Sequence, residues 1–166
     1  MRPVDDFIRN HPIFQDFRPD HLELVTSVAE EMRFTRDQYL LRQGQGAERF
    51  FIIRKGLVRI ELLSKEGETI PIQEVGPGDL LGWSWLLPPY KWGFDARAAE
   101  TTLALVFDGA SLRKKCEQNF EFGFRFLQVI SMALSRRLDV TRAHLLEYYS
   151  QRPHPWDGDD RRSAPD

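Results

Sequence analysis

Bulky aromatic side chains gather in the middle of the chain, where they could bind a ligand. Three of the four tryptophans lie within ten residues, together with a tyrosine and a phenylalanine. Such rings can line an apolar pocket in which a planar molecule stacks, or they can pack together as a closed core. The sequence leaves both interpretations open. The rings are Trp83, Trp85, Tyr90, Trp92 and Phe94.

Side chains for metal or nucleophilic chemistry are missing from the same region. A metal-dependent barrel enzyme needs two or three histidines and a carboxylate inside its sheet, but no histidine lies between residues 38 and 108. No serine or cysteine has a histidine within a recognisable motif. We therefore expect a protein without catalytic activity, metal or cofactor. The histidines expected to be solvated or to cap helices are His11, His21, His144 and His154.

The composition is typical of one globular domain. Of 166 residues, 42% are apolar and 12% aromatic, which is enough for a single core. Lys and Arg total 23 against 25 for Asp and Glu, so no basic excess favours nucleic acid. The only cysteine, Cys116, allows no intrachain disulfide and is expected to be an inert, half-buried thiol. No apolar run is long enough to span a bilayer. We expect a cytoplasmic protein that binds neither nucleic acid nor membrane.

Residues 1–33 are expected to be helical. The sequence Asp-His-Leu-Glu at residues 20–23 has the pattern of a capping box. Apolar residues then recur every three or four positions, which gives one stripe along a helix. The stripe consists of Leu22, Val25, Ala29 and Met32.

Residues 38–108 have the composition of short strands separated by glycines. Lys-Glu-Gly-Glu at residues 65–68 is the clearest hairpin tip, because it is polar and lies between two strand patterns. Closely spaced strands without intervening helices predict a mainly β fold, here a small antiparallel β-barrel. The expected strands are residues 39–41, 50–53, 57–63, 69–75 and 103–107.

Residues 111–149 are expected to form a short helix and, after a cap at Asn119, a long helix. Apolar residues recur along the long helix at the spacing of a narrow seam between two helices. We expect residues 120–130 to lie on the barrel, and the second half to pair with another copy of the chain. The predicted interface consists of Leu127, Leu134, Leu138, Thr141, Leu145 and Tyr148.

Residues 1–149 thus form one predicted domain. The remaining residues, 150–166, contain three prolines and mixed charges but almost no apolar side chains. Such a composition cannot bury enough apolar surface to fold. We expect a disordered tail.

This order of elements resembles the cyclic-nucleotide-binding domain of the catabolite activator (Crp/Fnr) superfamily. Arg-Lys-Gly-Leu-Val at residues 54–58 is similar to the family's turn into its third strand. Gly-Asp-Leu-Leu-Gly at residues 78–82 is similar to the start of its phosphate-binding cassette, and Arg-Arg-Leu-Asp-Val-Thr at residues 136–141 to its dimer helix. The resemblance implies a cupin-like double-stranded β-helix with N-terminal helices and a long C-terminal dimerisation helix.

Two positions depart from the family pattern. In the family, a glutamate after the cassette glycine binds the ribose and an arginine about ten residues later neutralises the cyclic phosphate. Here Trp83 follows Gly82, and Trp92 or Gly93 falls at the arginine position. Losing a buried charge pair costs about 2 to 5 kcal/mol, which would move a micromolar site towards the millimolar range. Ordinary cyclic AMP sensing is therefore not expected.

Other groups could still bind part of such a ligand. The backbone N–H groups from Gly82 to Ser84 could form an anion nest at the start of a short helix. Lys91 could replace a point charge but not a bidentate fork. Arg97, on the following strand, is either a pocket cation or a surface ion-pair partner.

The resemblance also implies two contacts from the long helix. Thr141 matches the hydroxyl that faces the purine, and Arg137 matches its neighbour one turn earlier. The alternatives are a polar residue in the dimer seam and a solvated charge. The sequence does not distinguish between these roles.

The predicted function is that of a non-catalytic sensor or regulatory module. A small, nucleotide-like effector would close the modified pocket, the hinge near Gln118 and Asn119 would shift, and a homodimer seam would repack. One alternative is a scaffold whose pocket is filled by Trp83 and Trp92 and which only pairs with itself or with a partner protein. Another is a fragment of a transcription regulator, because 17 residues after the long helix cannot form a DNA-binding domain.

Overall fold

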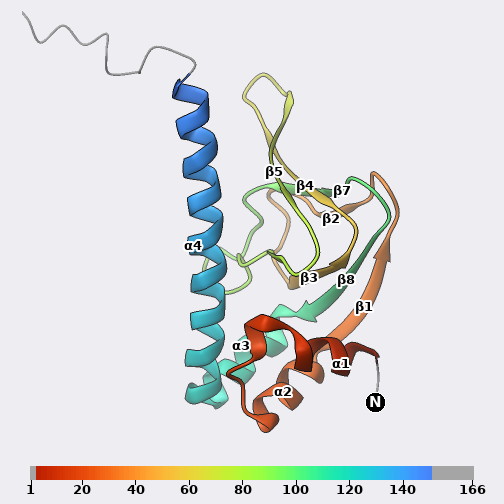
Figure 1. The fold of residues 1–166 in the computed structure, drawn as a ribbon, viewed down its shortest axis with the longest axis vertical. Helices are drawn as coiled ribbons and strands as arrows, with labels where there is room; N and C mark the ends of the chain where they lie inside the picture. Colours follow the sequence, from red (N-terminus) through yellow and green to blue (C-terminus); the bar gives the residue numbers. More distant parts are fainter. Residues whose placement is uncertain (1–2, 151–166) are drawn as a thin grey trace, which may run out of the picture. The chain divides into compact units, whose positions relative to one another are not determined.

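The computed structural model describes residues 3–150, which form two antiparallel sheets preceded and followed by helices (Figure 1). The mainly β fold with flanking helices is confirmed. The tail predicted at residues 150–166 lies outside the described residues, except for Ser150 at the end of the last helix. The helical elements are α1 (Pro3–Asn10), η1 (Pro12–Phe14), α2 (Pro19–Thr26), α3 (Gly109–Gln118) and α4 (Phe120–Ser150). The strands are β1 (Ala29–Phe34), β2 (Tyr39–Leu41), β3 (Arg49–Lys55), β4 (Val58–Leu63), β5 (Thr69–Val75), β6 (Leu80–Leu81), β7 (Asp95–Ala98) and β8 (Thr102–Asp108).

Each sheet has four strands. The strand orders are β1-β8-β3-β6 and β2-β7-β4-β5, and every pair is antiparallel. Side chains of the central strand β3 alternate between two apolar surroundings, as the pleat requires. Phe50 contacts Phe126 of α4 at 5.9 Å between ring centroids, whereas Phe51 contacts Phe34 of β1 at 6.3 Å. One face of this sheet therefore packs on helices.

The expected helix at the N-terminus is wrong for its last part. Helix α2 ends at Thr26, and the residues from Ala29 to Phe34 form strand β1, which pairs with β8 along its whole length. Ala29 and Phe34 are buried, and the positions between them are largely exposed. The spacing of these apolar residues is compatible with a helix as well as with a strand. Pairing with β8 satisfies the backbone groups and overrides helix propensity.

The predicted capping box does not cap α2. The helix begins at Pro19, and Arg18 at the N-cap position makes no capping hydrogen bond with its side chain. Proline suits this first position because it has no N–H to satisfy. Asp20 instead pairs with Arg18 at 2.9 Å, and Arg18 also reaches Glu121 at the start of α4 at 2.9 Å.

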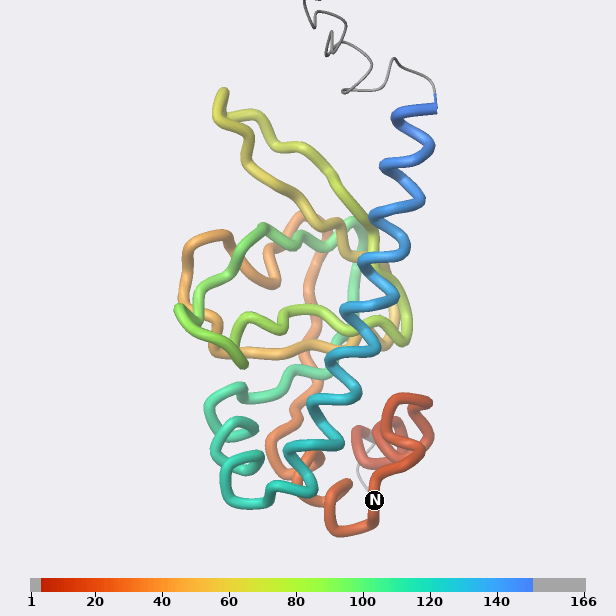
Figure 2. Tube along the Cα trace, turned by 90° about the vertical axis from the view of Figure 1, so that its left-hand side faces the viewer, coloured from red at the N-terminus to blue at the C-terminus, as the bar shows by residue number. Residues whose placement is uncertain are grey.

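The hairpin predicted at residues 65–68 is confirmed. It joins β4 to β5 and projects beyond the other strands of its sheet (Figure 2). The hydroxyl oxygen of Ser64 accepts hydrogen bonds from the backbone N–H groups of Glu66 and Glu68, at 3.2 and 3.1 Å. Gly67 has φ 84°, a left-handed conformation that favours glycine.

The two C-terminal helices are also present as expected. The side-chain oxygen of Asn119 accepts a hydrogen bond from the N–H of Phe122 at 3.0 Å, which caps α4. The early part of α4 packs through Phe122, Phe126 and Ile130, which are at most 3% exposed. Gly123 has no room for a side chain, because a Cβ there would lie 2.8 Å from the carbonyl oxygen of Cys116. Helices α3 and α4 are therefore held close together at their junction.

Residues 134–150 belong to a second compact unit. They continue helix α4 to Ser150. Within this unit, the hydroxyl of Thr141 donates to the carbonyl oxygen of Arg137 at 2.9 Å, and Arg142 pairs with Asp139 at 3.5 Å.

Two histidines expected to be solvated or to cap helices are buried. His21 is 1% exposed, lies edge-on to Phe17 and Phe122, and neither ring nitrogen has a hydrogen-bond partner among residues 3–150. Solvation was therefore the wrong expectation for His21, because Phe17 of the η1–α2 connection and Phe122 of α4 lie against its ring. His11 does cap, since its Nδ1 accepts from the N–H of Ile13 at 3.4 Å.

The environment of His11 makes stability depend on pH. Burial lowers the pKa of His11, and its contact with the backbone of Gly78 only partly opposes this. Because the folded state favours the neutral ring, this contribution to stability is complete above about pH 6.5, the ordinary pKa of histidine, and is lost as the pH falls below it. We expect His11→Asn, which keeps the capping acceptor, to reduce the loss of unfolding free energy between pH 7 and pH 5 in urea titrations.

A matched control is His144→Asn, because His144 is exposed on α4. It should leave the pH dependence unchanged. The prediction would be contradicted if the unfolding free energy of His11→Asn fell between pH 7 and pH 5 by as much as that of the native protein.

Candidate functional site

The candidate site begins where β6 ends. Gly78 and Gly82 flank this two-residue strand and have φ values of 89° and 80°, which side chains with a Cβ rarely adopt. The N–H of Gly78 donates to the carbonyl oxygen of Ile53 at 2.8 Å, and the Asp79 carboxylate accepts from the N–H of Gly76 at 2.8 Å. This turn fixes the direction in which residues 82–94, here called the cassette loop, leave the sheet.

The indole of Trp92 covers the first residue of the cassette loop. A Cβ on Gly82 would lie 2.9 Å from Cη2 and Cζ3 of this ring, and Trp92 is only 6% exposed. Its backbone is held as well, because its N–H donates to Gln45 at 3.0 Å and its carbonyl oxygen accepts from Gly44 at 2.8 Å. Only glycine leaves room for the indole at position 82.

The other two tryptophans of the loop have different surroundings. Trp85 is fully buried, with its ring centroid 6.2 Å from Phe50 and 6.0 Å from Phe126. Trp83 is half-buried and lies against Phe94 at 5.8 Å. Trp85 and Trp92 therefore belong to the packed interior, whereas Trp83 and Phe94 form a partly accessible aromatic pair.

The short helix expected to begin near Gly82 is absent. In its place are two turns, in which the N–H of Leu86 donates to Trp83 and that of Tyr90 to Leu87, both at 3.0 Å. Two consecutive prolines, joined by a cis peptide bond, follow Leu87 and remove the donors that a helix would need. The expected anion site at a helix start therefore lacks its helix.

The polar candidates of the loop are dispersed. Ser84 is half-buried, and Lys91 is exposed where its backbone forms an isolated β-bridge with Gly46. Lys91 directly precedes Trp92, whose indole covers Gly82. It remains the predicted source of positive charge in the loop.

Arg97 is committed to an ion pair. Its Nη2 lies 2.6 Å from Oε1 of Glu61 and its Nε lies 3.2 Å from Oε2, while Nη1 reaches Asp37 at 3.2 Å. The side chain of Glu61 is only 2% exposed. The hydrogen bonds that Arg97 donates to the Glu61 carboxylate raise the pKa of Arg97 above its ordinary value. Of its two predicted roles, Arg97 has the geometry of the ion-pair partner.

The sequence did not identify Glu61 as a site residue. Charged residues are common on half-exposed strands, so nothing in the local sequence sets Glu61 apart. Arg137 and Thr141 lie in the second unit, within residues 134–150. Their contribution to a ligand site remains a prediction.

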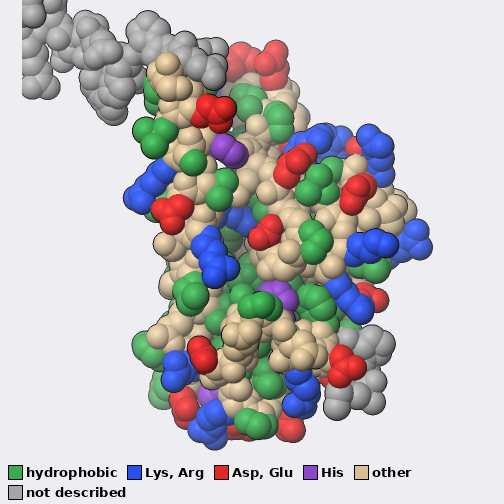
Figure 3. Space-filling model, viewed as in Figure 1, with side chains coloured by type: hydrophobic (Ala, Val, Ile, Leu, Met, Phe, Trp, Pro, Cys, Tyr) green, Lys and Arg blue, Asp and Glu red, His purple; other side chains and the backbone are tan. Residues whose placement is uncertain are grey.

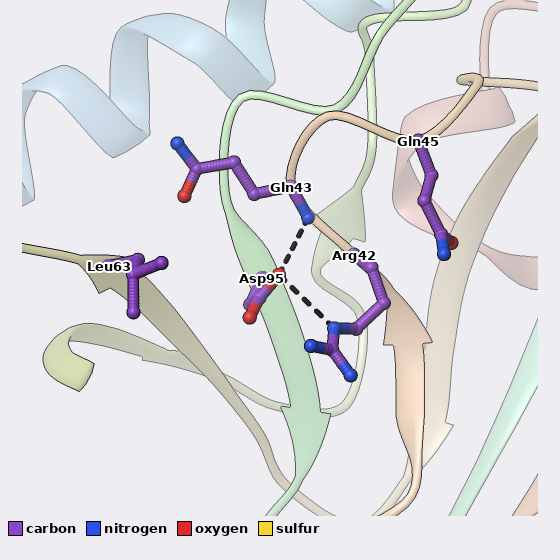
Figure 4. A pocket seen from close by; sticks show the side chains of 5 residues that line it. All are labelled: Arg42, Gln43, Gln45, Leu63 and Asp95. Atoms are coloured by element: carbon purple, nitrogen blue, oxygen red, sulfur yellow. Dashed lines mark hydrogen bonds and ion pairs between the residues drawn. The ribbon is translucent and has the colours of Figure 1, made fainter. Parts of the chain in front are cut away.

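A second feature that the sequence did not reveal is an open pocket of about 400 Å³ beside the start of β7 (Figure 4). Asp95 lies at its centre, where its carboxylate accepts from the N–H of Gln43 at 2.6 Å and pairs with Arg42 at 3.6 Å. Arg42 also stacks over the ring of Tyr39 at 4.0 Å. The charges in this pocket are already paired. Its lining residues are Arg42, Gln43, Gln45, Leu63 and Asp95.

Metal and thiol chemistry find no support among residues 3–150. No cluster of three histidine, cysteine or acidic side chains there could hold a metal ion. Burial raises the pKa of Cys116 to about 11, so its thiol is protonated at neutral pH and unreactive. On the face shown in Figure 3, acidic and basic side chains both occur among apolar ones.

The Arg97–Glu61 pair can be tested by its effect on stability. We expect Arg97→Gln to lower the unfolding free energy by about 2 to 4 kcal/mol in urea titrations, because the buried carboxylate of Glu61 would be left without its partner. The matched control is Arg59→Gln, which breaks the exposed pair of Arg59 with Glu74 on the same sheet and should cost less than about 1 kcal/mol. Equal effects of the two substitutions would show that burial adds nothing to the pair.

Comparison with curated proteins gives relatives in two groups. The chain is 37% identical over 78 residues to the cGMP-dependent protein kinase, isozyme 2 forms cD5/T2, of Drosophila melanogaster, which covers 46% of this chain and 8% of the kinase. It is 27% identical over 128 residues to the anaerobic regulatory protein of Bacillus subtilis, covering 76% of this chain and 54% of that protein. The chain thus spans less than two thirds of these relatives.

Solved structures are similar in fold. A Geobacter metallireducens GS-15 protein has a TM-score of 0.74 at 24% identity, with 83% of this chain and 99% of that one covered. A cyclic nucleotide-binding domain from Methylobacillus flagellatus KT has a TM-score of 0.74 at 18% identity, with 87% and 82% covered.

Among residues 3–150, no helix combines the length and the apolar character needed to cross a membrane. The family model of the cyclic nucleotide-binding domain matches residues 31–119, more than half of the chain and the part that runs from β1 through α3. This chain belongs to the cyclic nucleotide-binding domain family.

Proposed function

We propose that this protein is a non-catalytic sensor or regulatory module that binds a small effector in a modified cassette and signals through a dimer helix. The observation that supports a modified site is the indole of Trp92 against Gly82, where the family resemblance implies a phosphate contact. The family membership supports a regulatory role. The lone, unreactive Cys116 fits a reducing cytoplasm, and the balanced charge fits a protein that does not bind nucleic acid.

The charges around the cassette loop argue against a cyclic phosphate held in the usual way. Arg97 is engaged by Glu61 and Asp37, and Arg113 of α3 donates to the backbone oxygen of Trp85. A phosphate placed beside Gly82 would need a cation that is already positioned for it. Lys91, which is exposed, could approach only as a flexible point charge.

An effector must also displace an aromatic ring. Trp92 contacts Gly82 in the structure described, so an effector can reach the backbone there only if the indole moves. A movement that also shifts the backbone of Trp92 would displace Lys91 and Tyr90, the two residues before it. Ligand entry and a conformational change of the loop are therefore the same event.

The second candidate is a scaffold without a ligand, which the burial of Trp85 and Trp92 favours. The third is part of a transcription regulator, which fits the 54% coverage of the Bacillus subtilis regulator. A filled cassette leaves Trp92 in place whatever is added. Tryptophan fluorescence that ignores every candidate ligand would therefore support the scaffold over the sensor.

Calorimetry tests the nucleotide version of the proposal. Cyclic AMP, cyclic GMP and cyclic dinucleotides should be titrated into the full chain. Dissociation constants above about 100 μM for all of them would reject the nucleotide version.

We expect the double variant Trp83→Glu with Trp92→Arg to bind cyclic AMP at least about 30-fold more tightly than the native protein, because a charge pair contributes about 2 kcal/mol or more.

The control for this gain is Trp83→Gln with Trp92→Gln. It removes the same rings but supplies no charge. If it binds cyclic AMP as tightly as the charged variant, the gain in affinity comes from opening the cassette and not from the introduced glutamate and arginine.

The proposed dimer seam receives support from the exposure of α4. Leu127, Leu138 and Leu145 are between 47% and 53% exposed, although they are apolar. The seam also extends in the N-terminal direction, because Phe124 is 60% exposed three positions before Leu127 and Phe120 is 84% exposed four positions earlier. This alternating spacing of three and four residues is the spacing that two paired helices require.

Leu138→Asp should convert the proposed dimer to monomers in native mass spectrometry, because the substitution places a charge in an apolar seam. The matched control is Leu146→Asp, since Leu146 is 73% exposed on the same helix but outside the seam. It should leave the mass unchanged. A dimer that survives Leu138→Asp would place the interface elsewhere.

A further inference from the structure

One arginine of α3 makes two contacts with the cassette loop. Nη1 of Arg113 donates a hydrogen bond to the backbone carbonyl oxygen of Trp85. The same guanidinium lies over the ring of Tyr90, with Cζ 4.3 Å from the ring centroid. Arg113 therefore connects both ends of the turns at residues 85–90 to a helix outside the loop.

Trp85 itself contacts both C-terminal helices. Its ring lies 6.0 Å from that of Phe126 on α4. Its Cβ lies against Gly109, the first residue of α3, where an added Cβ would be only 2.8 Å away. The N–H of Gly109 is fixed by the carbonyl oxygen of Glu48 at 2.8 Å. A shift of Trp85 would therefore move α3, α4 or both.

Tyr90 links this contact to the indole that closes the cassette. It lies two residues before Trp92, and its φ of 54° is a left-handed conformation that a tyrosine rarely adopts. Its carbonyl oxygen accepts from the N–H of Ala47 at 2.7 Å. Trp92 is hydrogen-bonded to the same segment, through Gly44 and Gln45, so a displacement of its backbone is transmitted to Tyr90.

We propose that Arg113 is a positioning residue that couples the cassette loop to the α3–α4 junction. With Trp92 on Gly82, Tyr90 is stacked beneath the guanidinium and α3 is held to the loop. When Trp92 leaves Gly82, Tyr90 moves, the stack is broken and α3 is released. The proposal rests on the proposed sensor function for the event that moves Trp92, whereas the contact itself is part of the structure.

Arginine suits this position because of its shape. The planar guanidinium can stack on an aromatic ring and still donate in its own plane to a carbonyl oxygen. A lysine keeps the charge but cannot make both contacts at once. Arg113→Lys should therefore show a weaker form of the defect of Arg113→Gln.

Hydrogen–deuterium exchange of the ligand-free full chain tests the contact. We expect Arg113→Gln to speed exchange of amides in residues 83–92 and 109–118 by about tenfold, because a hydrogen bond from a charged donor is lost locally. Amides of β4 and β5 should keep their native rates. The matched control is Lys114→Gln, which changes the neighbouring exposed cation of the same helix and should alter neither segment.

A second comparison separates coupling from a merely structural contact. Trp92→Ala should speed exchange in residues 109–118 of the native background and add almost nothing in the Arg113→Gln background, because the route through Arg113 is already broken. Circular dichroism confirms that each variant is folded. Additive effects, or an increase that is equal in every strand, would overturn the proposal. Both readouts use protein without an effector, so a failed calorimetric titration rejects only the proposed sensor function.

Discussion

The aromatic contact around Phe126 holds the N-terminal helices, the sheet and the cassette loop to one helix. Its ring lies between 5.7 and 6.4 Å from the rings of Phe17, Phe50, Trp85 and Phe122. These residues come from the η1–α2 connection, β3, the cassette loop and α4. Aromatic pairs contribute about 0.5 to 1.5 kcal/mol each beyond their buried area. A displacement of any one of these segments therefore alters the packing at the start of α4.

The same packing holds the cassette loop in its shape through contacts between its own side chains and the rest of the domain. Trp85 is fixed by Phe126 and Gly109, and Trp92 by Gly82 and the backbone of residues 44–45. None of these contacts requires a bound phosphate. A loop that is ordered by its own indoles remains available as a moving part, since its position depends on contacts that a ligand can replace.

The sequence predicted those parts of the fold that depend on local signals. Glycine and polar residues marked the hairpin at residues 65–68, and Asn119 marked the start of α4. The sequence did not predict β1, because the spacing of Ala29 and Phe34 is compatible with a helix as well as a strand. Pairing with β8, which is distant in the sequence, decides for the strand. Glu61 and Arg113 were also missed. Their partners lie 36 and 28 residues away, and no local pattern encodes such a pairing.

The closed cassette also sets a requirement for any effector. An effector that enters beside Gly82 must offset the free energy with which the indole of Trp92 is buried, about 2 kcal/mol for a large apolar side chain. That amount lowers apparent affinity about 30-fold, because only the open fraction of the protein can bind. A small polar molecule cannot recover it in a loop whose nearby guanidinium groups are engaged by Glu61 and Trp85. A flat, largely apolar molecule can, because it restores the contact with Gly82 that the indole gives up.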